Sequence, residues 1–381
     1  MKKVKKLASV IVTAILISIL LCLTSCNKEK ETGPENNEDN SLTPVWVYDE
    51  IPYLEFAEIS RDGKWAIVAG NYKIAFLDLV NKQKLYELNL SESENDYVED
   101  VSISDQGYAV VGTSKGIKVF SSTQGLIANI STVEGRPIGG RPVKIAPSGN
   151  VYYAYGYIKF TVPNNLVWSI PTELQDQQGN WYYNPNFELS NDLDVSGNGE
   201  YIASSSSIYN SPVLVSDEGV IIWESTYDND AIESIKISYD GSKIVVGTLS
   251  EVSIYSSNNP TPLFRWAHNG YYARVAISDN GNIIAAGTSH GKLAIFDNNP
   301  ENPIVYDGPD GQTNDIAISS DGNIIVLATD FGGLEIYDKG GNLKYQHDSQ
   351  YSGVVGSLSI ATDGKTIGCV FHRKFHLYKL P

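Results

Sequence analysis

The sequence predicts an all-β protein built from repeated antiparallel sheets, and three observations lead to this prediction. A nine-residue phrase, apolar-x-apolar-Ser-x-Asp-Gly-x-apolar in its idealised form, recurs eight times. Within each copy apolar residues alternate with other residues at a period of two, which is typical of β-strands. The composition is 42% hydrophobic, with 33 Gly and 24 Tyr, and this excludes a largely disordered chain.

The spacing of the copies indicates a regular array. Each copy is anchored by one glycine, and these are Gly63, Gly107, Gly149, Gly199, Gly241, Gly281, Gly322 and Gly364. Successive anchoring glycines are 44, 42, 50, 42, 40, 41 and 42 residues apart. The single long interval, between Gly149 and Gly199, predicts one inserted loop in an otherwise even series of units.

Each unit reads as four strands. The first strand ends at the Asp-Gly or related pair, where glycine accepts the positive φ that a tight hairpin requires. A second strand follows, such as Lys243–Thr248, and then a third, such as Gly333–Asp338. The fourth carries an aromatic residue, as in VIIWES at residues 220–225. Four antiparallel strands in about 42 residues match one blade of a β-propeller.

The two chain ends complement each other. The last copy stops after its third strand, at Lys374–Leu380, and so lacks a fourth strand. The segment Val45–Asp49, with the sequence VWVYD, resembles the fourth strands of the other units. Because this pairing would remove two free sheet edges, the sequence predicts an eight-bladed β-propeller whose N-terminal strand completes the last blade.

The N-terminal sequence has the pattern of a targeting segment followed by a flexible tether. Residues 1–25 combine four lysines with an apolar run from Leu7 to Leu23, which is typical of a signal peptide. The tetrad Leu-Thr-Ser-Cys that ends at Cys26 resembles the bacterial lipobox, and this resemblance implies cleavage before Cys26 and its acylation, including palmitate. An uncleaved signal anchor is the alternative. Residues 26–44 are polar enough to form a flexible tether, which leaves 45–381 as the propeller.

The same resemblance implies a location. A lipid-anchored protein of this kind lies outside the cytoplasm, in the bacterial cell envelope. Asn27 stands where an Asp often signals retention in the inner membrane, so in a Gram-negative cell we expect the outer membrane or the cell surface.

Over residues 45–381 the chain resembles two families of propeller repeats. The Ser-x-Asp-Gly turn with a following Gly-Thr resembles WD40 and related repeats, and Val213–Trp223 (VLVSDEGVIIW) resembles quinoprotein-type, PQQ-like repeats. No copy ends its third strand with Trp-Asp, which departs from the WD40 pattern. The resemblance implies the architecture and says little about activity.

Charge and composition exclude several function classes. A formal net charge of −17 opposes binding of a nucleic-acid backbone. Cys369, His372 and His376 have a zinc-like spacing, but no fourth ligand is evident. Asp192 and Asp194 resemble part of a calcium loop, yet the repeat places Asp194 on a first strand. The five His residues are expected at blade ends or turns, and no catalytic residue, metal or cofactor is predicted.

Two groups of aromatic residues are candidate binding elements. The inserted loop contains Trp181, Tyr182 and Tyr183, which either form a recognition element or pack against each other. The connections from each fourth strand to the next first strand share one face of a propeller. Their tyrosines are Tyr53, Tyr97, Tyr227, Tyr271, Tyr272 and Tyr351, accompanied by acids such as Asp96. They either rim an acidic funnel for a cationic protein surface, peptide or glycan, or simply pack between blades.

Three functional hypotheses follow. The first is a non-enzymatic scaffold that binds a protein or another ligand and is held at the membrane by its lipid. The second is an accessory of outer-membrane protein assembly, since that machinery includes an eight-bladed propeller lipoprotein. The third is an enzyme acting on sugars or alcohols, as a lyase, a lactonase or a quinoprotein-like dehydrogenase. The enzyme hypothesis predicts clustered His, Arg or carboxylate groups in the central channel. The scaffold hypothesis predicts a channel without such a cluster and aromatic residues at the rim.

Overall fold

The computed structural model describes part of the chain. The described residues are 40–140, 142–154, 158–169, 173–175, 181–183, 192–206, 211–225, 230–297, 301–307, 311–330, 333–347 and 355–381. The chain divides into residues 1–40 and 41–381, and the structure below is that of the second unit. Cys26, with the rest of the predicted signal peptide and most of the predicted tether, lies outside the described residues.

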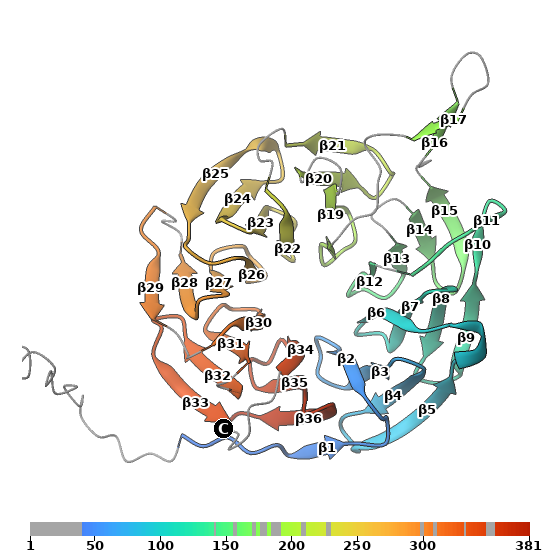
Figure 1. Cartoon of the computed structure of the whole chain (residues 1–381), viewed down its shortest axis with the longest axis horizontal. Coiled ribbons are helices and arrows are strands. Elements are labelled where there is room, and N and C mark those ends of the chain that lie inside the picture. The colour runs from blue at the N-terminus through green and yellow to red at the C-terminus, as the bar shows by residue number, and fades with distance from the viewer. Residues whose placement is uncertain are drawn as a thin grey trace, which may run out of the picture. The chain divides into compact units, whose positions relative to one another are not determined.

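Eight four-stranded antiparallel sheets are arranged in a ring around a central axis (Figure 1). Blade 1 contains β2 (Leu54–Ile59), β3 (Trp65–Gly70), β4 (Lys73–Asp78) and β5 (Gln83–Asn89), and blade 2 contains β6 (Val98–Ile103), β7 (Tyr108–Thr113), β8 (Gly116–Ser121) and β9 (Gly125–Ile130). Blade 3 contains β12 (Val143–Ile145), β13 (Val151–Ala154), β14 (Ile158–Thr161) and β15 (Asn165–Ser169), and blade 4 contains β18 (Leu193–Val195), β19 (Tyr201–Ser206), β20 (Ser211–Ser216) and β21 (Ile221–Glu224).

The second half of the ring repeats this plan. Blade 5 contains β22 (Ile232–Ile237), β23 (Lys243–Thr248), β24 (Glu251–Ser256) and β25 (Asn259–Ala267), and blade 6 contains β26 (Ala273–Ile277), β27 (Ile284–Thr288), β28 (Lys292–Phe296) and β29 (Ile304–Asp307). Blade 7 contains β30 (Thr313–Ile318), β31 (Ile324–Thr329), β32 (Gly333–Asp338) and β33 (Leu343–His347), and blade 8 contains β34 (Val355–Ile360), β35 (Thr366–Phe371), β36 (Lys374–Lys379) and β1 (Trp46–Tyr48). The prediction of an eight-bladed propeller is confirmed.

The hairpin after each first strand forms as the repeat predicts. All eight anchoring glycines have a positive φ, between 64° for Gly364 and 78° for Gly199. A side chain would be strained in this region of backbone space, so glycine fixes the register of each first and second strand. The Ser of the repeat supports the turn as well, since Ser319 Oγ donates to Asp321 and accepts from the amide of Ile324.

The apolar core lies between the blades. In one cluster, Ile67 and Phe76 of blade 1 pack with Val101 and Val111 of blade 2, and all four side chains are buried. Similar clusters join the other neighbours, because each sheet has two apolar faces and each face is covered by an adjacent blade. Stability therefore depends on an unbroken ring of contacts.

The last blade is completed by the N-terminal strand, as predicted. Strand β1 pairs antiparallel with β36, and Trp46 lies opposite Leu377 and Tyr48 opposite Phe375. The rings of Trp46 and Phe375 are 6.3 Å apart. The residues just before Val45 also pack on the ring, because Leu42 is only 6% exposed and its amide donates to the carbonyl of Gln346 in blade 7 over 2.8 Å.

Two small hairpins stand outside the blades. Strands β16 (Glu173–Gln175) and β17 (Trp181–Tyr183) pair within the predicted inserted loop. Strands β10 (Thr132–Val133) and β11 (Arg136–Pro137) form a hairpin between blades 2 and 3 that the sequence did not predict. A short 3-10 helix, η1, covers Glu92–Glu94. Within the described ranges, no helix has the length and apolar character that crossing a membrane requires.

Candidate functional site: the central channel

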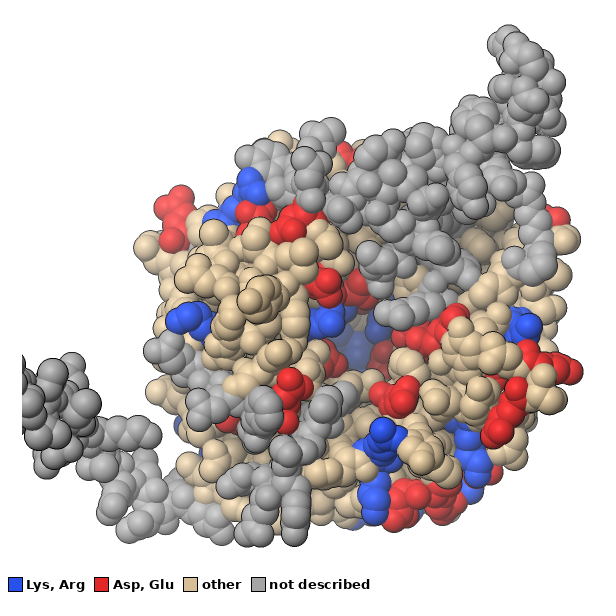
Figure 2. Space-filling view, in the orientation of Figure 1, with Lys and Arg blue, Asp and Glu red and all other residues tan. Residues whose placement is uncertain are grey.

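The innermost strand of every blade faces the central axis. These strands surround a cavity of about 360 Å³. Figure 2 shows the hollow at the centre of the ring, with both basic and acidic side chains around it. In the first strand of each blade, the residues five and seven positions before the anchoring glycine point their side chains toward the axis. They share one face because side chains of a strand alternate. We call the first set the middle level and the second set the mouth level.

The two faces of the ring differ. Each first strand starts near the connection from the preceding blade and runs to the Asp-Gly turn. We call the face with the connections the loop face and the opposite face the turn face. The mouth level is therefore closer to the loop face, and the middle level lies deeper in the channel.

At the mouth level, three carboxylates connect neighbouring blades. Asp100 accepts the amide of Val101 in its own blade over 2.8 Å and that of Val143 in the next blade over 2.9 Å. Asp192 and Asp315 repeat this arrangement in blades 4 and 7. Burial raises the pKa of Asp100 to about 6, although both amides favour the charged form. Burial likewise raises the pKa of Asp315. These carboxylates form part of the ring's structure.

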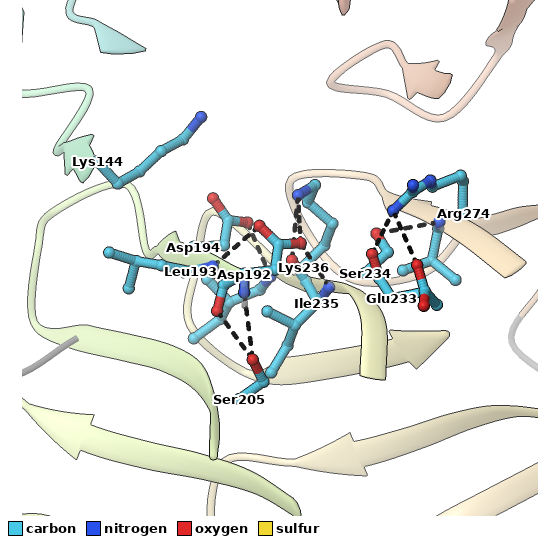
Figure 3. A network of polar contacts seen from close by, with 12 residues as sticks. Lys144, Asp192, Leu193, Asp194, Ser205, Glu233, Ser234, Ile235, Lys236 and Arg274 are labelled. Carbon is cyan, nitrogen blue, oxygen red and sulfur yellow. Dashed lines mark hydrogen bonds and ion pairs between the residues drawn. The ribbon is translucent and has the colours of Figure 1, made fainter. Parts of the chain in front are cut away.

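The middle level contains balanced charges. Lys144 of blade 3 reaches Glu58 of blade 1, with Nζ 2.9 Å from Oε2. Burial alone would lower the pKa of Lys144, but Glu58 and Asp194 offset this effect and the pKa is raised. Lys236 of blade 5 lies 3.4 Å from Asp192 Oδ2. Figure 3 shows Lys236 turned toward Asp192, whereas no dashed line joins Lys144 to Asp194.

Arg61 spans the turn-face end of the channel. It belongs to blade 1, yet its Nη2 lies 2.6 Å from Asp279 Oδ2 of blade 6. Its guanidinium also stacks 4.4 Å above the ring of Tyr239 in blade 5, and its carbonyl accepts the amide of Thr362 in blade 8 over 2.7 Å. One side chain thus bridges blades on opposite sides of the axis.

The channel wall is asymmetric. Blades 1, 3, 4 and 5 supply the charged side chains of the middle level, whereas blades 6 to 8 supply Ala276, Ala317 and Ser359 there. Ser357 adds a small side chain at the mouth level. These small residues leave space in the cavity, and the charged side chains of the middle level lie on the opposite wall.

Several of the predicted tyrosines lie on the loop face. Tyr53 is 62% exposed, and the guanidinium of Arg373 lies 4.5 Å from its ring. Tyr271 is 74% exposed, and its ring lies 5.2 Å from that of His290. Tyr97, at the same kind of connection, is 36% exposed. The neighbouring Tyr272 and Arg274 form a further pair, 5.3 Å apart.

Other predicted site residues are only partly placed. The backbone of Trp181, Tyr182 and Tyr183 forms β17. Tyr227 and Tyr351 lie outside the described residues, as does Cys26. Asp96 was expected at an acidic rim, but it is buried and pairs with Lys118 over 3.0 Å.

The channel charges are the functional candidates that the sequence reasoning missed. Glu58, Lys144, Asp194 and Lys236 each occupy the variable position between the two aliphatic residues of the repeat phrase. This position varies in polarity among the copies while its neighbours stay apolar. Because alternate residues of an innermost strand face the axis, that variable position was the available signal.

Two expectations about the chemistry need correction. The scaffold hypothesis predicted a channel without clustered charges, and this is wrong, because carboxylates, lysines and an arginine gather there. No His lies among the described lining residues. His376 was expected at a blade end or turn, but it lies inside β36. Among the described residues, no group of three or more His, Cys, Asp or Glu could hold a metal ion, and Asp194 lies on β18 as expected.

Comparison with known proteins supports the fold alone. No family model and no curated protein matches the sequence. A chain from the "Crystal Structure of Mitotic Checkpoint Complex" matches with 13% identity and a TM-score of 0.58, over 92% of this chain and 95% of that one. The computationally designed Ika8 protein matches with 15% identity and a TM-score of 0.66, over 89% and 98%. The chain is an eight-bladed β-propeller, consistent with the WD40-like resemblance of its repeats.

Proposed function

We propose that this protein is a non-enzymatic scaffold that binds a protein partner on its loop face. The observation that carries this proposal is the presence of exposed tyrosines, Tyr53, Tyr97 and Tyr271, on the same face as the channel mouth. Aromatic side chains that are already exposed and held on rigid strands give contact area at a low cost in conformational entropy. The similar chain in the mitotic checkpoint complex is, by its title, part of an assembly, which agrees with such a role.

The charge at the mouth indicates the kind of partner. Asp100, Asp192 and Asp315 lie at the mouth level, and burial raises the pKa of Asp100 and Asp315. The nearby Arg274 is turned toward Glu233 (Figure 3), and its Nη1 lies 3.9 Å from Glu233 Oε2. The Arg274 guanidinium also lies 5.3 Å from the ring of Tyr272. A lysine or arginine side chain of the partner would add the missing positive charge there. We therefore expect a basic peptide or a cationic protein surface.

The absence of catalysis is part of the proposal. Acyl transfer requires a nucleophile beside a base, and glycoside cleavage requires carboxylates free to exchange protons. In the channel, the carboxylates of Asp100, Asp192 and Asp315 each accept two backbone amides, and Glu58 is paired with Lys144. Because these carboxylates are occupied in joining the blades, they are not free to act as catalytic acids or bases. This argues against a lyase, a lactonase or a quinoprotein-like dehydrogenase.

The proposal places the scaffold at the bacterial envelope. Its lipid would be attached to Cys26, and the polar residues that follow would give it reach from the membrane surface. An accessory role in outer-membrane protein assembly is a second candidate, favoured by the blade count of eight.

Binding to defined basic peptides tests the proposal. Immobilised protein should bind a Lys- and Arg-containing peptide, and should not bind the same peptide with Glu at those positions. Replacing Tyr53 and Tyr271 by Ala should weaken binding by about tenfold or more. Val80→Ala is a matched control, because Val80 is 67% exposed at the opposite, turn face. Equal affinity in both variants, or equal binding of both peptides, would contradict the proposal.

A further inference from the structure

Three of the five histidines of the chain gather where its two ends meet. His347 ends β33 of blade 7, His372 lies in the turn before β36, and His376 lies within β36. The rings of His347 and His376 are 6.4 Å apart. Phe371 lies between the three, at 4.2 Å from His372, 5.3 Å from His347 and 5.4 Å from His376. The histidines therefore form one cluster at the seam between blades 7 and 8.

The cluster contacts the segment that closes the ring. We call residues 41–48 the clasp, because they run from the edge of blade 7 to the edge of blade 8. Ser41 forms a parallel bridge with Gln346, and Leu42 is buried against both blades. His347 Nδ1 lies 2.8 Å from the carbonyl oxygen of Leu42. His376 lies directly opposite Val47 in the β1–β36 pair. Two histidines thus support the clasp at its two ends.

The surroundings of His376 suit only a neutral ring. Its Nε2 is buried and has no hydrogen-bond partner among the described residues, and its Nδ1 lies 3.5 Å from the hydroxyl of Tyr378. A proton on Nε2 would therefore be a buried donor without an acceptor, which is costly. Burial and the neighbouring cationic groups lower the pKa of His376 to about 4.

The other groups around the cluster do not supply a compensating anion. Strand β35 contributes Cys369, opposite His376, and burial raises the pKa of this thiol to about 12. Strand β36 contributes Tyr378 and Lys374, and the Lys374 ammonium lies 3.2 Å from Asp49, the residue after β1. The clasp itself, with the sequence SLTPVWVY, contains no carboxylate and no cation. The charges near His376 are thus His347, His372 and Lys374, all of one sign when protonated.

We propose that the clasp is acid-sensitive, so that protonation of His376 separates β1 from β36 and releases the clasp. The proton on His376 Nε2 finds an acceptor only when water reaches it. Water reaches it when β1 separates from β36. The released segment joins the propeller to the predicted lipid tether, so acidification would loosen the connection between the ring and its anchor.

Hydrogen exchange of the backbone amides tests this proposal locally. Protection factors, which correct for the intrinsic effect of pH, are compared at about pH 7 and about pH 4.5. We expect the clasp and β36 to lose about tenfold or more in protection, while β7 and β23, far along the chain, keep theirs. The double variant His347→Asn and His376→Phe should remove this drop, because neither new side chain takes a proton. The matched control His290→Phe changes a histidine on the loop face and should keep it.

Two outcomes would overturn the proposal. One is a wild-type clasp whose protection is unchanged at the lower pH, and the other is a double variant with the same drop as wild type. A histidine titration of the wild-type protein by NMR covers the case in which the double variant does not fold. In that titration, His376 must become protonated over the same pH range in which the clasp amides lose their protection. Protonation of His376 near its ordinary pKa, with the clasp still protected, would also refute the proposal.

Discussion

Replacing Leu42 by Ala tests whether the clasp stabilises the propeller. Leu42 is 6% exposed and packs with Leu334, Ile336 and Phe371 at the seam of blades 7 and 8. Removing a buried Leu side chain costs about 2–5 kcal/mol, and a site at the rim can partly collapse, so we expect about 2–3 kcal/mol. With an unfolding entropy of about 2.1 cal/mol/K per residue, residues 41–381 give about 0.7 kcal/mol/K. The melting temperature should therefore fall by about 3–4 °C.

The assay is thermal unfolding followed by circular dichroism at neutral pH, checked against denaturant unfolding. Leu343→Ala is the matched control, because Leu343 lies on β33, the strand that the clasp contacts, and is 39% exposed. This control should change the free energy of unfolding by less than about 0.5 kcal/mol. If both variants melt at the same temperature, Leu42 does not contribute to the closure of the ring, and our description of the clasp is wrong.

Three further predictions concern the anchor, the inserted loop and pH. Cys26→Ser should move the protein from the membrane to the soluble fraction after ultracentrifugation, and a variant that still sediments with membranes would refute the lipid anchor. Replacing Trp181, Tyr182 and Tyr183 together by Ala should weaken partner binding by about tenfold without changing the melting temperature, and an unchanged affinity would exclude this loop from the site. Burial and cationic neighbours lower the pKa of His376 from its ordinary value of 6.5 to about 4. The neutral ring is thus favoured in the fold, so its contribution to stability is complete above pH 6.5 and is lost as the pH falls toward 4, by up to about 3 kcal/mol. Asp100, whose pKa burial raises to about 6, acts in the opposite direction, because its protonated form is favoured in the fold and adds stability as the pH falls. The effect of His376 is therefore measured as the difference in the free energy of unfolding between wild type and His376→Phe at each pH. If this difference does not change with pH, the prediction is contradicted.

The blades were predictable because their signal is local and repeated. Strands β23 (Lys243–Thr248) and β32 (Gly333–Asp338) begin and end where the repeat placed them. Glycines that require a positive φ mark every first turn, and period-two alternation marks the strands on either side. Because the repeat phrase occurs eight times, the pattern remains clear even where a single copy departs from it. The closure by β1 was also predictable, since an incomplete last unit and a spare strand at the other end complement each other.

The channel was harder to predict, because its contacts join residues that are distant in the sequence. Lys144 meets Glu58 two blades away, and Arg61 meets Asp279 more than 200 residues away. Such pairs depend on how far each side chain reaches across the axis, which no local pattern encodes. The repeat phrase nevertheless showed which positions vary, and those positions proved to face the axis.

The histidine cluster shows a second limit of sequence reasoning. The sequence showed a zinc-like spacing of Cys369, His372 and His376. It did not show that the ring of His376 lies beside that of His347, which belongs to another blade. Pairing of β33 with the clasp, through Gln346 and Leu42, brings it there. The close spacing of Cys369, His372 and His376 in the sequence was therefore a poorer guide to the cluster than the contact between blade 7 and the clasp.

The position of Arg61 has a consequence for traffic through the molecule. Its side chain reaches across the axis to Asp279 and stacks on Tyr239, so it narrows the channel at the turn face. A solute passing through this end would have to displace the ion pair between Arg61 and Asp279. The two faces of the ring are therefore inequivalent for passage into the channel.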